Sequence, residues 1–171
     1  MRTLLGRILR LWLSFIRGQL TLMFAVGLIT WLGLLALGVP RAFFLGLVAA
    51  ALEVVPNLGP TISTVLGVIV ALLQGSNRLA LSPPTLALVV FLFYVLVQQF
   101  ENLVLVPRVM GDALKLPSLL VLAAVLLGGL VGGPVGAILA TPMLASGREI
   151  LRYIRQRRRN QDPFATAQVL P

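Results

Sequence analysis

The sequence predicts an all-α integral membrane protein with two full transmembrane helices and two re-entrant helical hairpins that enter from opposite faces. Its mean hydropathy is +1.00 and only 11% of its residues are charged, whereas soluble domains carry about 25% charged residues. Two apolar runs have the length of a membrane span. Two further runs are too long for one span and are interrupted by Gly and Pro. Six short spans would place every loop on the same sides, and only the length of the short arms argues against them.

Several classes of chemistry are excluded by composition. The chain has no cysteine and no histidine, which removes disulfides, thiol catalysis, His-based zinc sites and His general bases. It contains no nucleophile–base pair, no metal-ligand cluster and no phosphate-binding loop followed by Lys-Ser/Thr. We therefore predict that the protein is not an enzyme and has neither a cofactor nor a metal site.

The two ends of the chain are basic. Residues 1–17 predict an amphipathic helix lying on the membrane surface, because apolar and basic side chains fall on different helix faces. The apolar face carries Leu4, Ile8, Leu11, Trp12 and Phe15, and the polar face carries Arg7, Arg10, Ser14 and Arg17. Residues 148–171 predict a basic helix followed by a disordered tail. The basic residues could also indicate nucleic-acid binding, but their position at the edges of apolar runs favours the positive-inside rule, so we expect no nucleic-acid partner.

The membrane domain is expected over residues 18–147. Residues 19–38 and 85–106 are apolar and match the roughly 20 residues that cross a bilayer core. Residues 75–84 read as a loop by their turn residues, and residues 110–117 as a short connector. Val39-Pro40-Arg41 and Val106-Pro107-Arg108 follow the two spans, and each is followed by a broken apolar run. This order of elements indicates an internal repeat.

Residues 42–74 form the first broken run, and this otherwise apolar region carries one acid, Glu53. The predicted breaks are Pro56 and Pro60, which bracket Asn57 and Gly59. Each arm would be about 20 Å long at about 1.5 Å per residue, which is too short for a bilayer core of about 30 Å. A re-entrant hairpin with residues 56–60 at its tip fits this pattern best.

Residues 118–146 form the second broken run. The predicted breaks are Gly132, Gly133 and Pro134, within a tip at residues 131–135. With the N-terminus inside, every basic residue except Arg41 and Arg78 falls on the inner side, as the positive-inside rule expects. Both termini would then be cytoplasmic, and the two hairpins would enter the membrane from opposite faces.

Glu53 is the main candidate for function, because an ionisable residue beside broken backbone at membrane depth is a functional-site hypothesis. It would bind a coupling proton or cation, helped by Asn57 and by free carbonyls near Pro56. The alternative is a structural hydrogen bond from Glu53 to the backbone at the tip. Glu101 could likewise line a pathway or pair with Arg108 near the inner surface. Thr61, Ser63 and Thr64 are expected to bond back to their own helix more often than to line a pore.

The residues of the broken runs and span ends resemble those of a known family, the autoinducer-2 exporters or PerM-type permeases of bacteria. The resembling segments, in order, are Gly38-Val39-Pro40, Leu45-Gly46, Glu53-x-x-Pro56-Asn57-x-Gly59-Pro60, Gln98-Gln99-x-Glu101-Asn102, Val106-Pro107-Arg108-Val109-Met110-Gly111, Gly133-x-x-Gly136 and Leu139-Ala140-x-Pro142. The resemblance covers nearly all of residues 10–150 and corresponds to the C-terminal portion of family members. It implies a transporter of the bacterial inner membrane that forms homo-oligomers.

The predicted function is therefore transport of a small signalling molecule, such as autoinducer-2 in quorum sensing, or of a cation by sodium–proton exchange. The expected partners are the lipid bilayer, further copies of the chain and the transported solute or ion. The expected pathway residues are Glu53, Asn57, Gly59, Pro60, Gln99, Glu101 and Asn102. The alternative is a truncated membrane module that only oligomerises and does not transport.

Overall fold

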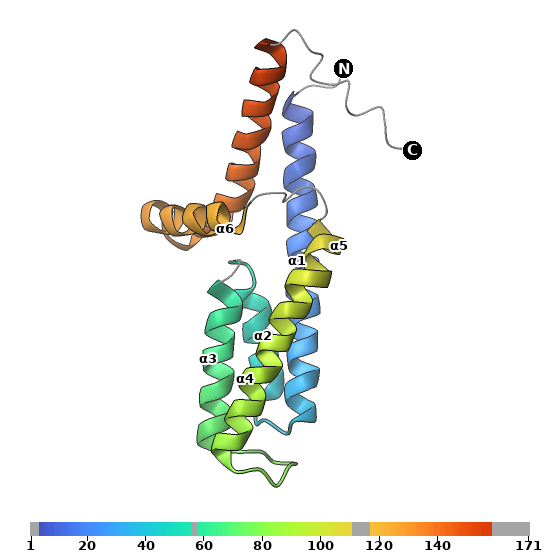
Figure 1. Cartoon of the computed structure of the whole chain (residues 1–171), viewed down its shortest axis with the longest axis vertical. Coiled ribbons are helices and arrows are strands. Elements are labelled where there is room, and N and C mark those ends of the chain that lie inside the picture. The colour runs from blue at the N-terminus through green and yellow to red at the C-terminus, as the bar shows by residue number, and fades with distance from the viewer. Residues whose placement is uncertain (1–3, 56–57, 111–116, 159–171) are drawn as a thin grey trace. The chain divides into compact units, whose positions relative to one another are not determined.

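The protein is all-α wherever its structure is described, which confirms the all-helical part of the predicted fold class (Figure 1). The structure is a computed structural model that describes residues 4–55, 58–110 and 117–158. Three of its helical runs are long and apolar enough to cross a membrane, namely Leu4–Ala36, Pro83–Val109 and Leu119–Arg158. The chain divides into two compact units. Unit 1 comprises Met1–Ile16 and Ala113–Pro171, and unit 2 comprises Arg17–Asp112.

Helix α1 (Leu4–Ala36) is continuous, although the sequence suggested a surface helix followed by a separate span. No proline occurs within it, so nothing obliges the helix to stop. Its 33 residues measure about 50 Å, whereas a bilayer core is about 30 Å thick. One end of α1 must therefore extend beyond the hydrocarbon core if the other end spans it.

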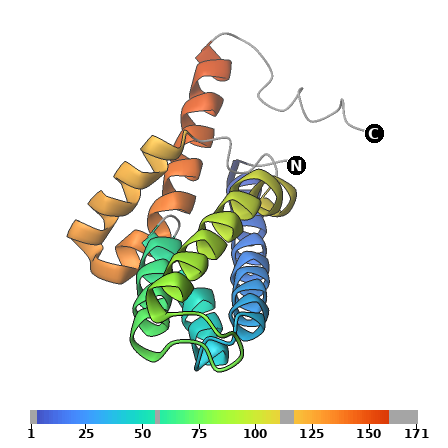
Figure 2. The ribbon, with the colours of Figure 1, turned by 60° about the horizontal axis from the view of Figure 1, so that its bottom comes forward.

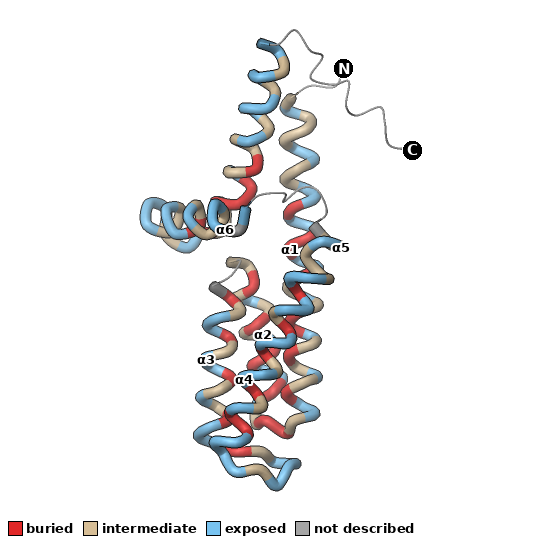
Figure 3. The backbone as a smooth tube through the Cα atoms, in the orientation of Figure 1, coloured by how far each residue is buried: buried red, intermediate tan, exposed pale blue. Residues whose placement is uncertain are grey.

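Unit 2 contains the C-terminal part of α1 and five further segments. These are α2 (Ala42–Leu52), α3 (Leu58–Gln74), α4 (Pro83–Phe100) and the short helices η1 (Glu101–Leu105) and α5 (Val106–Met110). Helix α3 packs against both α2 and α4. Buried residues lie mainly on the helix sides that face neighbouring helices (Figure 3). Large apolar residues such as Leu73 and Leu96 are exposed. An apolar outer surface of this kind suits contact with lipid.

Unit 1 is built around α6 (Ser118–Arg158), which contains a sharp reversal at Gly133 (Figure 2). Gly133 has φ 60° and ψ −150°, a conformation that is accessible essentially only to glycine. The two arms then pack closely, because Gly128 on the first arm contacts the backbone of Gly136 on the second. The reversal falls inside the tip expected at residues 131–135. The second arm contains Pro142 and continues into the basic segment, so the hairpin and the expected C-terminal helix belong to one helical element.

The N-terminal turns of α1 contact the second arm of α6 within unit 1. The Arg7 guanidinium donates a hydrogen bond to the Glu149 carboxylate at 3.1 Å, and the two side chains are 19% and 20% exposed. The Trp12 indole N–H donates to the Ser146 hydroxyl at 2.9 Å. These contacts give the basic, apolar-faced start of α1 a protein partner in addition to any membrane surface.

The Arg7–Glu149 ion pair is expected to contribute less than about 1 kcal/mol to the free energy of unfolding, because both side chains reach solvent. A double-mutant cycle with Arg7→Ala and Glu149→Ala, followed by denaturant unfolding in detergent, measures this coupling energy. Arg10→Ala is the control, since Arg10 is exposed on the same helix. A coupling energy above about 2 kcal/mol would show that the pair is a principal clamp of unit 1 instead.

Candidate functional site

Glu53 lies immediately after α2, in the turn that leads to α3. Its backbone N–H donates to the Ala49 carbonyl at 3.0 Å, and its own carbonyl accepts a hydrogen bond from the Gln19 side-chain amide at 2.5 Å. Gly59 packs directly on the Leu52–Glu53 peptide, where a Cβ atom would overlap backbone atoms. The Glu53 side chain is 2% exposed. Contacts from α1 and α3 therefore hold this acid inside unit 2.

Glu101 begins η1, a single turn of π-helix that interrupts α4 and α5. Pro107 has no N–H to bond the carbonyl four residues earlier and its ring clashes with that turn, which accounts for a local widening of the helix. Short π turns inside helices occur frequently at functional sites. Glu101 is 7% exposed, so the turn carries a buried acid.

The carboxyl groups of Glu53 and Glu101 lie together and share a hydrogen bond. A hydrogen bond between two carboxyl groups requires that one of them carries a proton. The second oxygen of each group, Oε2, is buried and has no hydrogen-bond partner among the described residues. We refer to these two side chains as the carboxyl pair.

No basic side chain is buried near the carboxyl pair in the described part of unit 2. The four arginines there are all exposed, namely Arg17, Arg41, Arg78 and Arg108. Burying two unpaired negative charges would cost several kcal/mol per ion. The carboxyl pair must therefore hold a proton or a cation to be stable at this depth.

The structure brings together only some of the residues expected in the pathway. Glu53, Gly59 and Glu101 are buried close to one another, whereas Gln99 and Asn102 are exposed on the outer sides of α4 and η1. Pro60 lies in the first turn of α3 and not in the break, a position where its missing N–H has no partner to lose. Pro56 and Asn57 lie outside the described residues. Glu101 faces Glu53, so the pairing with Arg108 considered from spacing does not describe this carboxyl.

Two buried hydroxyl groups of unit 2 differ from what the sequence predicts, because Tyr94 has no predicted role and Ser63 is predicted to bond back to its own helix. Thr64 bonds back to the Pro60 carbonyl at 2.7 Å, as expected for hydroxyls of this helix. The hydroxyls of Ser63 and Tyr94 are different, because they are buried and have no hydrogen-bond partner in the described structure. The only signal in the sequence is the repeat of small residues at every fourth position through Ser63 in α3.

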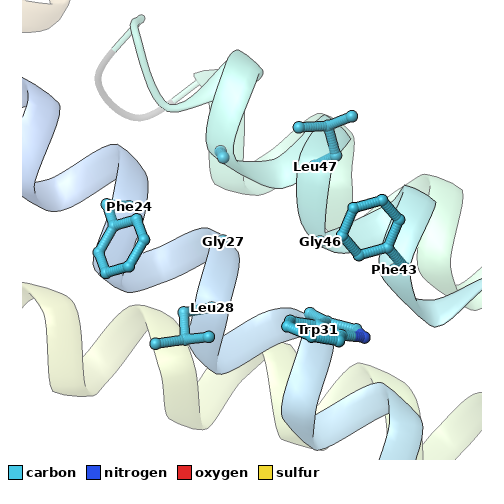
Figure 4. Close-up of a pocket in the computed structure, with 8 residues that line it drawn as sticks. Phe24, Gly27, Leu28, Trp31, Phe43, Gly46 and Leu47 are labelled. Atoms are coloured by element: carbon cyan, nitrogen blue, oxygen red, sulfur yellow. The ribbon is translucent and has the colours of Figure 1, made fainter.

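A separate apolar groove of about 210 Å³ lies between α1 and α2 (Figure 4). It is lined by Phe24, Gly27, Leu28 and Trp31 of α1 and by Phe43, Gly46, Leu47 and Ala50 of α2. None of these side chains is charged, so the groove offers no group that would neutralise an ion. The carboxyl pair is therefore the better candidate for ion chemistry.

Comparisons with known proteins point to one family. A sequence profile described as "AI-2E family transporter" matches residues 1–156. The "Putative transport protein YueF" of Bacillus subtilis (strain 168) is 31% identical over 152 residues, which is 86% of this chain and 39% of the relative. The "AI-2 transport protein TqsA" of Escherichia coli (strain K12) is 37% identical over 117 residues, which is 68% of this chain and 32% of the relative. The chain thus spans between 32% and 39% of the length of these two relatives.

Proposed function

The chain belongs to the AI-2E family of transporters, and from this premise we propose that the carboxyl pair binds a proton or cation whose movement is part of transport. The protein is a multi-pass membrane protein of a transporter family. The observation that carries the proposal is the carboxyl pair itself, which is buried without a basic partner in the described residues. Buried ionisable residues within membrane proteins commonly mark ion pathways.

The lengths of the short helices support an alternating-access pathway built from re-entrant hairpins. Helices α2 and α3 have 11 and 17 residues, or about 17 and 26 Å, so neither spans a core of about 30 Å unaided. We take α2–α3 and α6 as the two re-entrant hairpins, inserted from opposite faces of the bacterial inner membrane with both termini cytoplasmic. Sites at the tips of such broken elements are typical of transporters built from inverted repeats.

The proposed solute is a small signalling molecule, and the ion is a proton or sodium. Support for the solute comes from the name of TqsA, an AI-2 transport protein that is 37% identical over the shared region. Support for the ion comes from the carboxyl pair, whose oxygen atoms suit a proton or a hard cation. We propose that the working form is a homo-oligomer in the lipid bilayer.

Flux measurements in proteoliposomes test this function. A pH-sensitive dye under a sodium gradient and labelled autoinducer-2 would be followed in parallel. Glu53→Gln and Glu101→Gln are each expected to reduce ion flux to the level of vesicles without protein, because each removes half of the carboxyl pair. Glu149→Gln is the matched control, since that acid lies in unit 1 and is paired with Arg7.

Two outcomes would count against the proposal. Ion flux that persists in folded Glu53→Gln would show that the carboxyl pair does not carry the ion. A folded wild-type chain with neither flux would indicate a membrane module that does not transport by itself.

A further inference from the structure

One face of α3 leads away from Glu53 along the contact with α4. Gly59, Ser63 and Gly67 are four residues apart, so they lie above one another on the same side of the helix. Gly59 contacts the Leu52–Glu53 peptide, and Gly67 contacts the ring and hydroxyl of Tyr94. Ser63 therefore lies between Glu53 and Tyr94.

The side of α4 that faces α3 also connects the carboxyl pair with Tyr94. Tyr94 and Glu101 are seven residues apart, which corresponds to two turns on one side of a helix. Glu101 contacts Glu53 at one end, and Tyr94 contacts Gly67 at the other. The carboxyl pair, Ser63 and Tyr94 thus follow one line between α3 and α4, which we call the polar line.

Every side chain of the polar line is buried and has an oxygen atom without a hydrogen-bond partner among residues 4–55, 58–110 and 117–158. Glu53, Ser63, Tyr94 and Glu101 are between 2% and 7% exposed, and each carries such an oxygen. Buried polar atoms are normally satisfied by protein or by internal water, which makes two to four hydrogen bonds. Hydroxyl groups and water both donate and accept hydrogen bonds, which is the property required to pass a proton along a line.

Beyond Tyr94 the same two helix faces become apolar. Ala71 lies one turn after Gly67 on α3, and Val90 and Leu86 lie one and two turns before Tyr94 on α4. All three are completely buried and belong to one apolar cluster with Leu34. The polar line therefore ends at an apolar seal made by Ala71, Leu86 and Val90.

We propose that Ser63 and Tyr94 extend the carboxyl pair into a water-bridged proton path that the apolar seal closes beyond Tyr94. This inference rests on the proposed function, because it assumes that the carboxyl pair exchanges protons. It adds two hydroxyl residues to the pathway and identifies the position at which the described state is shut. Opening the seal would then connect the carboxyl pair to the side of the membrane reached by the loop between α3 and α4.

The test is the passive proton leak of proteoliposomes, followed with an internal pH-sensitive dye and no solute. Val90→Thr places a hydroxyl in the seal with little change of shape, and it is expected to raise the leak several-fold above wild type. Adding Tyr94→Phe or Ser63→Ala to Val90→Thr is expected to return the leak towards the wild-type rate, because each removes one hydroxyl of the polar line. Thr64→Val in the same background is the control, since its hydroxyl already bonds the Pro60 carbonyl.

The proton path would be overturned if the leak of Val90→Thr were unchanged by both hydroxyl removals. It would also be overturned if folded Val90→Thr showed no increased leak. Folding is checked by circular dichroism.

Tyr94→Phe alone, which keeps the aromatic ring, provides a second variant. Its expected result is slower proton flux under the sodium gradient with the protonated carboxyl band still present in the infrared spectrum. Loss of that band would instead mean that Tyr94 holds the proton on the carboxyl pair, which contradicts a path. The leak needs no solute, so failure of solute transport and failure of the path are read separately.

Discussion

Gly136→Ala is expected to destabilise the α6 hairpin by about 1–3 kcal/mol, the cost typical of overpacking a tight contact. A Cβ atom at position 136 would overlap the carbonyl oxygen of Gly128, and this backbone atom cannot rotate away as a side chain could. Gly132→Ala is the matched control four residues earlier. Nothing lies within 4 Å of a Cβ atom there, so alanine is expected to be neutral or to stabilise the helix by up to about 1 kcal/mol.

Unfolding in detergent followed by tryptophan fluorescence measures this difference. Trp12 reports on unit 1, because its indole N–H bonds Ser146 on the second arm of α6. The measurement is made in a Trp31→Phe background, since Trp31 belongs to unit 2. Equal stabilities of the two alanine variants would show that the arms of α6 separate freely and that the contact between Gly128 and Gly136 is not required.

The double replacement of the carboxyl pair by Glu53→Gln and Glu101→Gln is expected to abolish ion flux without lowering the free energy of unfolding. The amides remove two groups that are costly to bury when charged, and amide side chains can still hydrogen-bond to each other. Loss of activity together with equal or higher stability is expected when the residues of a functional site lower the free energy of unfolding. The measurement pairs proteoliposome flux with denaturant unfolding of the same preparations.

A different result would assign the carboxyl pair to the fold. If the double variant were destabilised by more than about 2 kcal/mol, the shared hydrogen bond would be a structural contact between the α2–α3 turn and η1. The free energies of unfolding of the two single variants then show which carboxyl group contributes more to stability. The variant that leaves the more costly lone buried carboxyl group is expected to be the less stable one.

The sequence predicts the helical class and the position of the second reversal for clear physical reasons. Long apolar runs determine the helices, and glycine next to Pro134 allows the left-handed backbone at Gly133. The sequence also singles out Glu53, because a single acid in an apolar run is conspicuous. It does not predict that α1 continues through residue 18, since amphipathic and apolar segments can belong to one helix or to two.

The contact between Glu53 and Glu101 could not be predicted from spacing. It depends on the packing of α3 and α4 and on the π turn, which pattern analysis along a regular helix does not represent. The same limit explains Gln99 and Asn102, which neighbour Glu101 in the chain yet lie on exposed sides. The sequence predicts that Ser63, like Thr64, bonds back to its own helix, and only the three-dimensional structure distinguishes the two hydroxyls.

The π turn at Glu101–Leu105 also bears on how this segment tolerates changes in length. A π turn contains more residues than a regular turn of 3.6 residues. This segment therefore has more residues than an ideal α-helix would have over the same axial distance. A deletion of one residue, such as Asn102, would let a regular α-helix form through this segment without rotating either flank. Because Glu101 directly follows α4 and precedes the deleted residue, it would keep its position towards Glu53. At this point in the chain, the loss of one residue could be absorbed without moving the carboxyl pair.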